Sequence, residues 1–135
     1  MAPTSVLKQV SVFVENRPGR LRTMLQALYD RNINIRALSI ADTSDFGIVR
    51  MILSDTEAGA KALREAGFTA SLTDVLRVEL PDKPGGLLKA AIEPLAEAGL
   101  NVQYIYAFVD TPLESAAAVV KTNDAERARK VLEGQ

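Results

Sequence analysis

Two short turns carry the groups best suited to binding a small polar molecule. The first is Asn16-Arg17-Pro18-Gly19, and the second, in altered form, is Asp82-Lys83-Pro84-Gly85. Each turn stands between an alternating strand pattern and an amphipathic helix pattern. A Pro-Gly turn that opens a helix leaves backbone N–H groups unpaired at the positive end of the helix dipole, where a carboxylate binds favourably. The turns therefore favour a ligand-binding function over a catalytic one.

The two turns differ in their first side chain. Asn16 offers a donor and an acceptor, which suits the carboxylate and ammonium groups of an α-amino acid. Ionised Asp82 only accepts, so it would pair with an ammonium and repel a carboxylate. We expect the first turn to be the stronger site, with Val14 or Phe46 favouring an apolar ligand side chain. Asn and Asp also cap such turns locally, so a purely structural turn is the alternative.

Composition removes most enzyme mechanisms. Hydrophobic residues make up 47% of the 135 residues, enough for one ordinary core or two small ones. Without Cys the chain has no disulfide, no thiolate metal site and no cysteine nucleophile. Without His it lacks the commonest general base and the commonest metal ligand, which excludes Ser-His-Asp chemistry and most zinc chemistry. We expect no catalysis and no cofactor.

Charge and hydropathy limit the partners and the compartment. Sixteen basic and seventeen acidic residues give a net charge of −1, which supplies no attraction for nucleic acid or an anionic membrane. The opening residues contain no basic stretch followed by a long apolar run, and no later segment approaches a membrane span. We expect a cytoplasmic protein that binds neither nucleic acid nor membrane.

The elements around the turns show that the chain is one unit written twice. Apolar residues alternate over Val10–Val14 before the first turn and over Leu76–Leu80 before the second. An offset of 66 residues relates Gly19 to Gly85 and also relates the two strands. The repeats are therefore in register on their inward faces.

An amphipathic helix follows each turn. In the first repeat its apolar stripe comprises Leu21, Met24, Leu25 and Leu28. In the second repeat Pro94 lies inside the helix, where it removes a backbone hydrogen bond and should kink the rod. The offset from Asn34 to Asn101 is 67, so one residue was gained along the second helix. We place this insertion near Pro94.

Hairpins and second helices complete the repeats. Ser54-Asp55-Thr56-Glu57 has the form of a capping box before an Ala-rich helix that ends at Gly67, and Asp124 begins its equivalent. Phe68–Leu72 forms a fourth strand in the first repeat. The predicted second and third strands are Ile35–Ala41 and Gly47–Leu53, then Val102–Phe108 and Ser115–Lys121.

The resulting order predicts the α+β class, with two ferredoxin-like (βαββαβ) units in tandem. Each is an antiparallel sheet with helices on one face, and the domains are residues 1–73 and 74–135. The second unit lacks its last strand, because only three residues follow Leu132. An unpaired sheet edge invites a partner. Another copy completes it, or the segment Met1–Lys8 covers it, or the sequence is a truncated form.

These motifs resemble the ACT domain, a small regulatory module attached to many enzymes of amino-acid metabolism. The likeness rests on residues 12–21 and 32–35 in the first repeat, and on residues 81–87 and 99–102 in the second. The first repeat is similar to the serine-sensing ACT domain of phosphoglycerate dehydrogenase. A histidine precedes the turn asparagine by two positions in that domain, and Val14 stands there in this chain.

The resemblance implies amino-acid binding between ACT units. The ligand-contacting asparagine of the turn corresponds to Asn16 and the contact at the head of the second strand to Asn34, with Asp82 and Asn101 as their equivalents. It implies a homodimer or higher homo-oligomer and a possible metabolic enzyme as partner. The expected ligand-binding residues are Asn16, Arg17, Gly19, Arg20, Leu21, Asn34, Ile35, Asp82, Gly85, Gly86, Leu87, Asn101 and Val102.

Two functions are consistent with the sequence. The first is a non-catalytic regulatory protein that senses a small amino acid bridging the first turn of one ACT unit and the second strand of its neighbour, within the chain or across a dimer. The alternative is a regulatory or assembly subunit that docks on a metabolic enzyme, with weak or no ligand binding.

Overall fold

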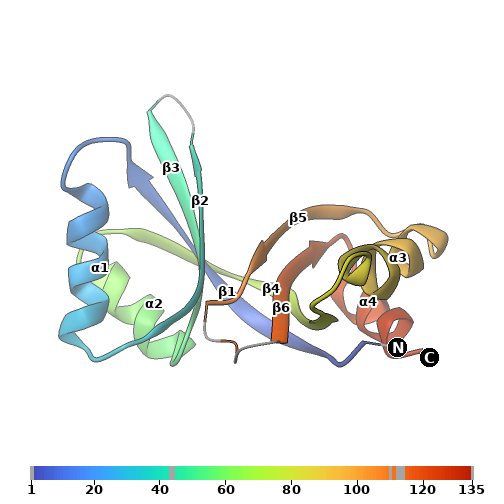
Figure 1. Cartoon of the computed structure of the whole chain (residues 1–135). Helices are drawn as coiled ribbons and strands as arrows, with labels where there is room; N and C mark the ends of the chain where they lie inside the picture. Colours follow the sequence, from blue (N-terminus) through green and yellow to red (C-terminus); the bar gives the residue numbers. More distant parts are fainter. Residues whose placement is uncertain (1, 43–44, 110, 112–114, 135) are drawn as a thin grey trace. The chain divides into compact units, whose positions relative to one another are not determined.

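The structure is a computed structural model that describes residues 2–42, 45–109, 111 and 115–134 (Figure 1). Its elements alternate as the sequence predicts, with strands and helices in two similar series. In chain order they are β1 Thr4–Glu15, α1 Arg20–Asp30, β2 Ile35–Asp42, β3 Phe46–Leu53, α2 Thr56–Glu65, β4 Thr69–Pro81, the π-helix η1 Leu88–Ile92, α3 Glu93–Glu97, β5 Val102–Ala107, β6 Ser115–Thr122 and α4 Ala125–Leu132.

The elements form two compact units, as expected for tandem ferredoxin-like repeats. One unit spans Lys8–Thr73, and the other combines Asp74–Gln135 with the N-terminal residues up to Leu7. Each unit has its own cluster of buried apolar side chains. The boundaries between the units fall inside β1 and β4, so each of these strands contributes residues to both.

The first unit is an antiparallel sheet covered by two helices. Its strands follow the order β2-β3-β1-β4. Helices α1 and α2 lie on one face (Figure 1), where Leu28 and Leu63 pack with the inward valines of β1. Val10 pairs with Met51, and Val14 pairs with Gly47 at the other end of the register. The alternation that predicted the first strand therefore does place one face of β1 in the core.

The second unit has the corresponding order β5-β6-β4, with the start of β1 as its fourth strand. The amide of Glu79 in β4 donates to Pro3 at 2.9 Å, and the amide of Ala2 donates to Leu132 at the end of α4 at 2.8 Å. Ala2 is 3% exposed and packs with the core of this unit. The N-terminal arm, defined as residues 2–7, therefore lies where the missing last strand would be, which is the second of the three alternatives.

Strand β4 corrects one expectation of the sequence. The fourth strand of the first repeat and the first strand of the second were expected as separate strands around Thr73 and Asp74, but β4 runs unbroken over Thr69–Pro81. Neither position is Gly or Pro, the residues that most strongly favour a turn, so the strand can continue through both.

The helix after the second turn contains the extra residue of the second repeat. It begins as η1, a π-helical turn over Leu88–Ile92, and continues as α3. A π-turn holds one residue more than an α-turn between hydrogen-bonded partners. Pro94 lies two residues after its end, at the second position of α3, and has no N–H to donate to the preceding turn. The irregularity therefore lies next to Pro94, where the sequence places the insertion.

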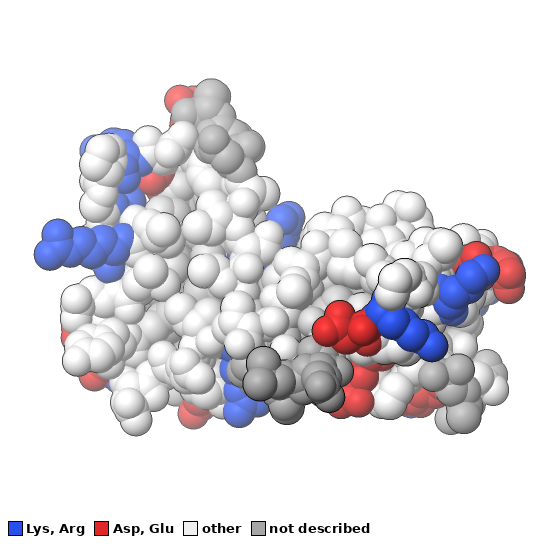
Figure 2. Space-filling view, viewed as in Figure 1, with Lys and Arg blue, Asp and Glu red and all other residues white. Residues whose placement is uncertain are grey.

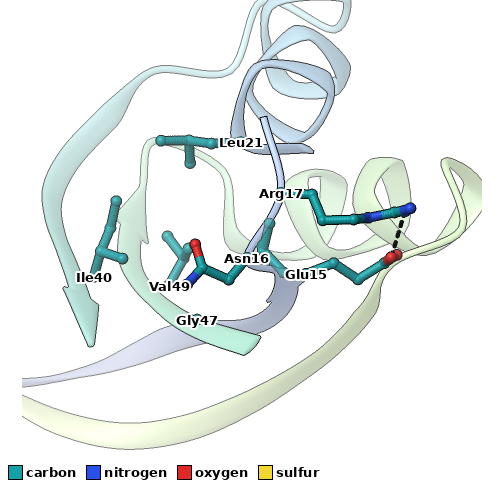
Figure 3. A pocket seen from close by; sticks show the side chains of 8 residues that line it. Glu15, Asn16, Arg17, Leu21, Ile40, Gly47 and Val49 are labelled. Carbon is teal, nitrogen blue, oxygen red and sulfur yellow. Dashed lines mark ion pairs between the residues drawn. The ribbon is translucent and has the colours of Figure 1, made fainter. Parts of the chain in front are cut away.

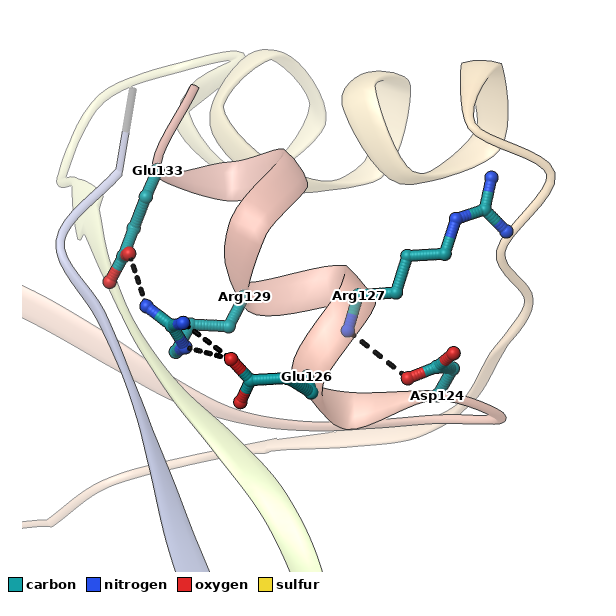
Figure 4. Close-up of polar contacts among 5 residues, drawn as sticks. All are labelled: Asp124, Glu126, Arg127, Arg129 and Glu133. Atoms are coloured by element: carbon teal, nitrogen blue, oxygen red, sulfur yellow. Dashed lines mark hydrogen bonds and ion pairs between the residues drawn. The ribbon is translucent and has the colours of Figure 1, made fainter. Parts of the chain in front are cut away.

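Aspartate side chains begin α2 and α4, in agreement with the predicted caps. Asp55 accepts from the amide of Ala58 at 3.1 Å, and Asp124 accepts from the amide of Arg127 at 3.1 Å. In Figure 4 the cap of α4 lies beside an ion-pair cluster on the same helix. Both helices therefore start with a satisfied amide and a negative charge at the positive end of the dipole.

The ion-pair cluster of α4 joins three side chains. Arg129 donates to Glu126 and also to Glu133, at 2.6 Å in the second case (Figure 4). The hydrogen bond from Arg129 lowers the pKa of the Glu126 carboxyl below its ordinary value. The same bond raises the pKa of Arg129. Glu126 and Arg129 therefore both keep their charges near neutrality.

Candidate functional site

The first turn has a backbone conformation that depends on glycine. Gly19, the residue before α1, has φ +88°, in the left-handed region that other residues adopt at a cost. The amide of Arg17 donates to Glu15 at 2.8 Å and the amide of Thr23 donates to Gly19 at 3.0 Å. The amides of Leu21 and Arg22 have no acceptor among the described residues. The start of α1 therefore has the free donors that the sequence predicts.

The second turn repeats this backbone with one difference. Gly85 has φ +81°, and the amide of Lys83 donates to Pro81 at 3.0 Å, matching the first turn residue for residue. A Cβ atom on the next residue, Gly86, would lie 2.0 Å from the Pro81 carbonyl oxygen. The first turn has Arg20 at that position. The backbone of the second turn therefore packs so closely against the end of β4 that position 86 has no room for a side chain, whereas the equivalent position of the first turn has one.

A pocket of about 290 Å³ opens beside the first turn. It lies between the ends of β1 and β3, the start of α1 and the edge strand β2. Figure 3 shows the amide of Asn16 on the side of the pocket occupied by Ile40 and Val49, and the guanidinium of Arg17 pointing away. The lining residues are Val14, Glu15, Asn16, Arg17, Leu21, Ile40, Gly47 and Val49.

Charges at the rim of the pocket are already arranged around one carboxylate. Glu15 forms an ion pair with Arg17 (Figure 3), and its other oxygen lies 3.5 Å from Nε of Arg20. The guanidinium of Arg20 stacks over the ring of Phe68 at 4.7 Å from the ring centroid. The backbone amide of Asn16 donates to Asp45 at 2.9 Å. The rim is thus held in place by an ion pair, a longer charge contact and a backbone hydrogen bond.

Expected site residues of the first unit divide between two places. Asn16, Arg17 and Leu21 line the pocket, and Gly19 lines an adjoining groove along α1. Asn34 lies at the opposite end of the sheet, where its amide donates to the hydroxyl of Ser54 at 2.9 Å.

The distance between these places follows from the strand register. Ile35 begins β2 opposite Leu53, whereas the turn end of β2 lies opposite Gly47. Eight residues of strand separate Asn34 from the turn end of β2, which is roughly 25 Å. Asn16 and Asn34 of one unit therefore do not contact the same small molecule.

The second unit separates its expected residues in the same way. Asp82, Gly85, Gly86 and Leu87 belong to the turn that follows β4, and Leu87 is 42% exposed. Asn101 and Val102 stand at the far end of β5, where the Asn101 amide lies 3.3 Å from Oδ1 of Asn123.

Several pocket residues are not among the expected site residues. Ile40, Val49 and Gly47 come from the hairpin, and Glu15 ends β1. The sequence contained one signal for them, the glycine that begins the predicted strand Gly47–Leu53, because a glycine in a strand often marks a close approach to a ligand. Val14 lines the pocket as its expected role requires. Phe46 is not among the lining residues.

The described residues also bear on whether the chain has a metal site, a strongly charged surface or a membrane-spanning helix. No group of three or more His, Cys, Asp or Glu side chains among them is placed to hold a metal ion. On the face drawn in Figure 2, their positive and negative side chains are scattered among uncharged areas. No helix in the described part of the chain is long and apolar enough to cross a membrane.

Two βαββαβ units with matching turns define a tandem ferredoxin-like protein. The chain belongs to the ACT domain family, because the model of the ACT domain pair matches residues 5–134. This match covers both units and confirms the general resemblance found in the sequence.

Solved structures of similar proteins agree with this assignment. Protein BT0572 from Bacteroides thetaiotaomicron is 36% identical, with a TM-score of 0.89 over 96% of this chain and 88% of that one. The regulatory subunit of aspartate kinase from Thermus thermophilus is 17% identical, with a TM-score of 0.68 over 98% and 95% of the two chains. The corresponding subunit from Thermus flavus is 20% identical, with a TM-score of 0.62 over 96% and 94%. No functionally curated protein matches the chain.

Proposed function

We propose that this protein is a non-catalytic regulator that binds a small amino acid in the pocket at the first turn. The observation that carries the proposal is the position of the pocket, directly beside Asn16 and the start of α1. The membership in the ACT family supports it, because the family implies amino-acid binding at this turn. The pocket combines polar groups on one side with apolar side chains on the other, as an amino acid requires.

The polar groups suit the two charges of an amino acid. The amides of Leu21 and Arg22 at the positive end of α1 receive the carboxylate. The side-chain carbonyl of Asn16 accepts from the ammonium. The ligand therefore binds with its charged end at the turn and its side chain toward the sheet.

A second ACT unit completes the site in this proposal. Asn34 is too far from Asn16 of its own unit to share a ligand, so the second contact must come from another ACT unit, and we place it in a second copy of the chain. The protein is then a homodimer or higher homo-oligomer, and ligand binding changes the packing of its subunits. Strand β2 ends the sheet order of the first unit, and Ile40 on it is 50% exposed.

A thermal-shift screen of the twenty proteinogenic amino acids tests this function. Saturation with a ligand that binds only the folded form, at about a hundred times its dissociation constant, adds about 2.7 kcal/mol of stability. The variant Asn16→Ala should lose the shift, and Asp82→Ala, at the equivalent position in the second turn, should keep it. Serine is included because the first repeat resembles a serine-sensing domain.

The controls separate this proposal from its alternative. A screen without any stabilising amino acid contradicts the sensor function. In that case a metabolic enzyme that co-purifies in stoichiometric amount from the native cell identifies the docking subunit instead. Equal shifts for the wild type and Asn16→Ala place the ligand elsewhere and contradict the assignment of the site.

A further inference from the structure

One glycine in the middle of the pocket wall creates the space that a ligand side chain requires. Gly47 pairs with Val14, so the two residues share the face of the sheet that carries the helices. On the same face of β3, the following inward positions are Val49, Met51 and Leu53, all buried in the core. Gly47 is the one inward position of β3 without a side chain, and the pocket lies over it.

The backbone does not need a glycine at this position. Gly47 is absent from the glycines with positive φ, so its conformation is ordinary strand. A Cβ atom there would lie 3.7 Å from the Ala41 carbonyl oxygen and 3.8 Å from both Cγ2 of Ile40 and the Val14 carbonyl oxygen. These are normal van der Waals distances. The effect of Gly47 is therefore the hollow itself and not the path of the chain.

The walls of the hollow are aliphatic. Val14 and Val49 are 5% and 1% exposed and form the floor beside Gly47. Leu21 and Ile40 form the rim and remain 37% and 50% exposed (Figure 3). Among the described residues, no aromatic ring lines the pocket, and the polar side chains all come from residues 15–17 at the turn. A branched aliphatic group placed in the hollow covers the apolar side chains of Val14, Ile40 and Val49.

The size of the pocket restricts the ligand to one small molecule. A volume of about 290 Å³ is at the lower end of the range for small-molecule sites, which is roughly 300–1,000 Å³. A single amino acid with its charged end at the turn fills such a space. A larger or strongly polar side chain would either protrude or place its polar atoms against the valines without partners.

We propose that the pocket selects amino acids with branched aliphatic side chains, valine, leucine or isoleucine, and that Gly47 is the residue that determines this selectivity. The inference rests on the proposed amino-acid-binding function. The ligand side chain takes the place that an inward side chain of β3 would otherwise occupy, in contact with Val14, Ile40 and Val49. Selectivity against serine follows because its hydroxyl would lose water without gaining a hydrogen bond.

The residues of the second unit at the equivalent positions do not leave such a hollow. Leu80 pairs with Ala116 in the same register in which Val14 pairs with Gly47. A larger side chain and an added methyl group therefore stand at the two floor positions, although Ala107 replaces Ile40 at the rim. The selective site is expected once per chain.

Calorimetric titration of the wild type and Gly47→Ala with leucine, isoleucine, valine, alanine, serine and lysine tests the proposal. The branched amino acids should bind the wild type at least about tenfold more tightly than alanine or serine. Gly47→Ala should keep the melting temperature of the free protein and bind leucine about tenfold more weakly, with the affinity for alanine changed less than about threefold. The control Ala116→Val, at the equivalent position of the second unit, should bind leucine as the wild type does.

The possible failures are distinguishable. Tightest binding of serine or lysine overturns the selectivity and leaves the sensor function intact. An equal loss of affinity for leucine and alanine in Gly47→Ala also overturns it, because the added methyl group then acts on the whole ligand and not on its side chain. If no amino acid binds, the proposed function fails and the selectivity fails with it.

Discussion

Substitution of Ala2 by Asp tests whether the N-terminal arm is the fourth strand of the second unit. Ala2 is 3% exposed and packs in the core of that unit. A carboxylate at this position would lose its water without a charged partner, at a cost of several kcal/mol. The arm has a cheaper alternative, because it can detach from β4 and expose the carboxylate to water. The loss in the free energy of unfolding therefore cannot exceed the free energy with which the arm is attached to the second unit.

The contribution of the arm follows from its contacts. Outside the ladder between β1 and β4, two backbone hydrogen bonds hold the first residues of the arm, Ala2 and Pro3: one from Glu79 to Pro3 at 2.9 Å and one from Ala2 to Leu132 at 2.8 Å. Each contributes about 1 kcal/mol net. The buried methyl group of Ala2 adds about 0.8 kcal/mol. The variant Ala2→Asp should thus lose about 3 kcal/mol, which corresponds to roughly a hundredfold change in an opening equilibrium.

Amide hydrogen exchange locates the effect. In Ala2→Asp the amide of Glu79 should exchange about a hundred times faster, while the amide of Met51 in the first unit keeps most of its protection. Val6→Asp is the matched control, because Val6 is in the same arm but 36% exposed, and it should change the exchange of Glu79 severalfold at most. Unchanged protection of Glu79 in Ala2→Asp would refute the role of the arm. Equal losses at Glu79 and Met51 would show general unfolding instead.

Two further predictions concern local structure. Glu126→Gln should lower the melting temperature at pH 7 and leave it unchanged once the pH is below the folded-state pKa of Glu126, because that pKa lies below the unfolded value. Its stabilisation by Arg129 is then complete above about pH 4.3 and is lost as the pH falls through the folded-state pKa; a pH-independent difference in melting temperature would contradict this. Gly86→Ala should destabilise the protein by about 1–3 kcal/mol in urea unfolding, because its Cβ would lie 2.0 Å from the Pro81 carbonyl oxygen. Gly47→Ala, where the nearest atom is 3.7 Å away, serves as the control, and equal stability of the two variants would disprove the steric explanation.

Local patterns in the sequence were enough to predict most of the fold. The alternation over Val10–Val14 places those valines in the core, and Asp55 and Asp124 cap their helices as their positions predicted. The insertion near Pro94 was visible because the two repeats could be compared. Each of these features depends on residues within a few positions of one another, which is the range over which periodicity and capping act.

Features that depend on distant residues were not predicted or were left open. The attachment of Ala2 beside Leu132 joins opposite ends of the sequence, and neither residue has a type that specifies it. The pocket required Ile40 and Gly47 from the hairpin to meet Asn16 at the turn, which depends on strand register. Continuity of β4 was missed because two units were assumed to need separate strands.

The division of β1 and β4 between the two units affects how this protein can change during evolution. A tandem duplication usually produces two modules that can be exchanged, lost or fused to other proteins one at a time. Here a break between Thr73 and Asp74 would cut β4 and leave the second repeat without the arm that lies on the far side of the first. The two repeats are therefore inherited as one indivisible piece, even though their sequences remain recognisable as copies.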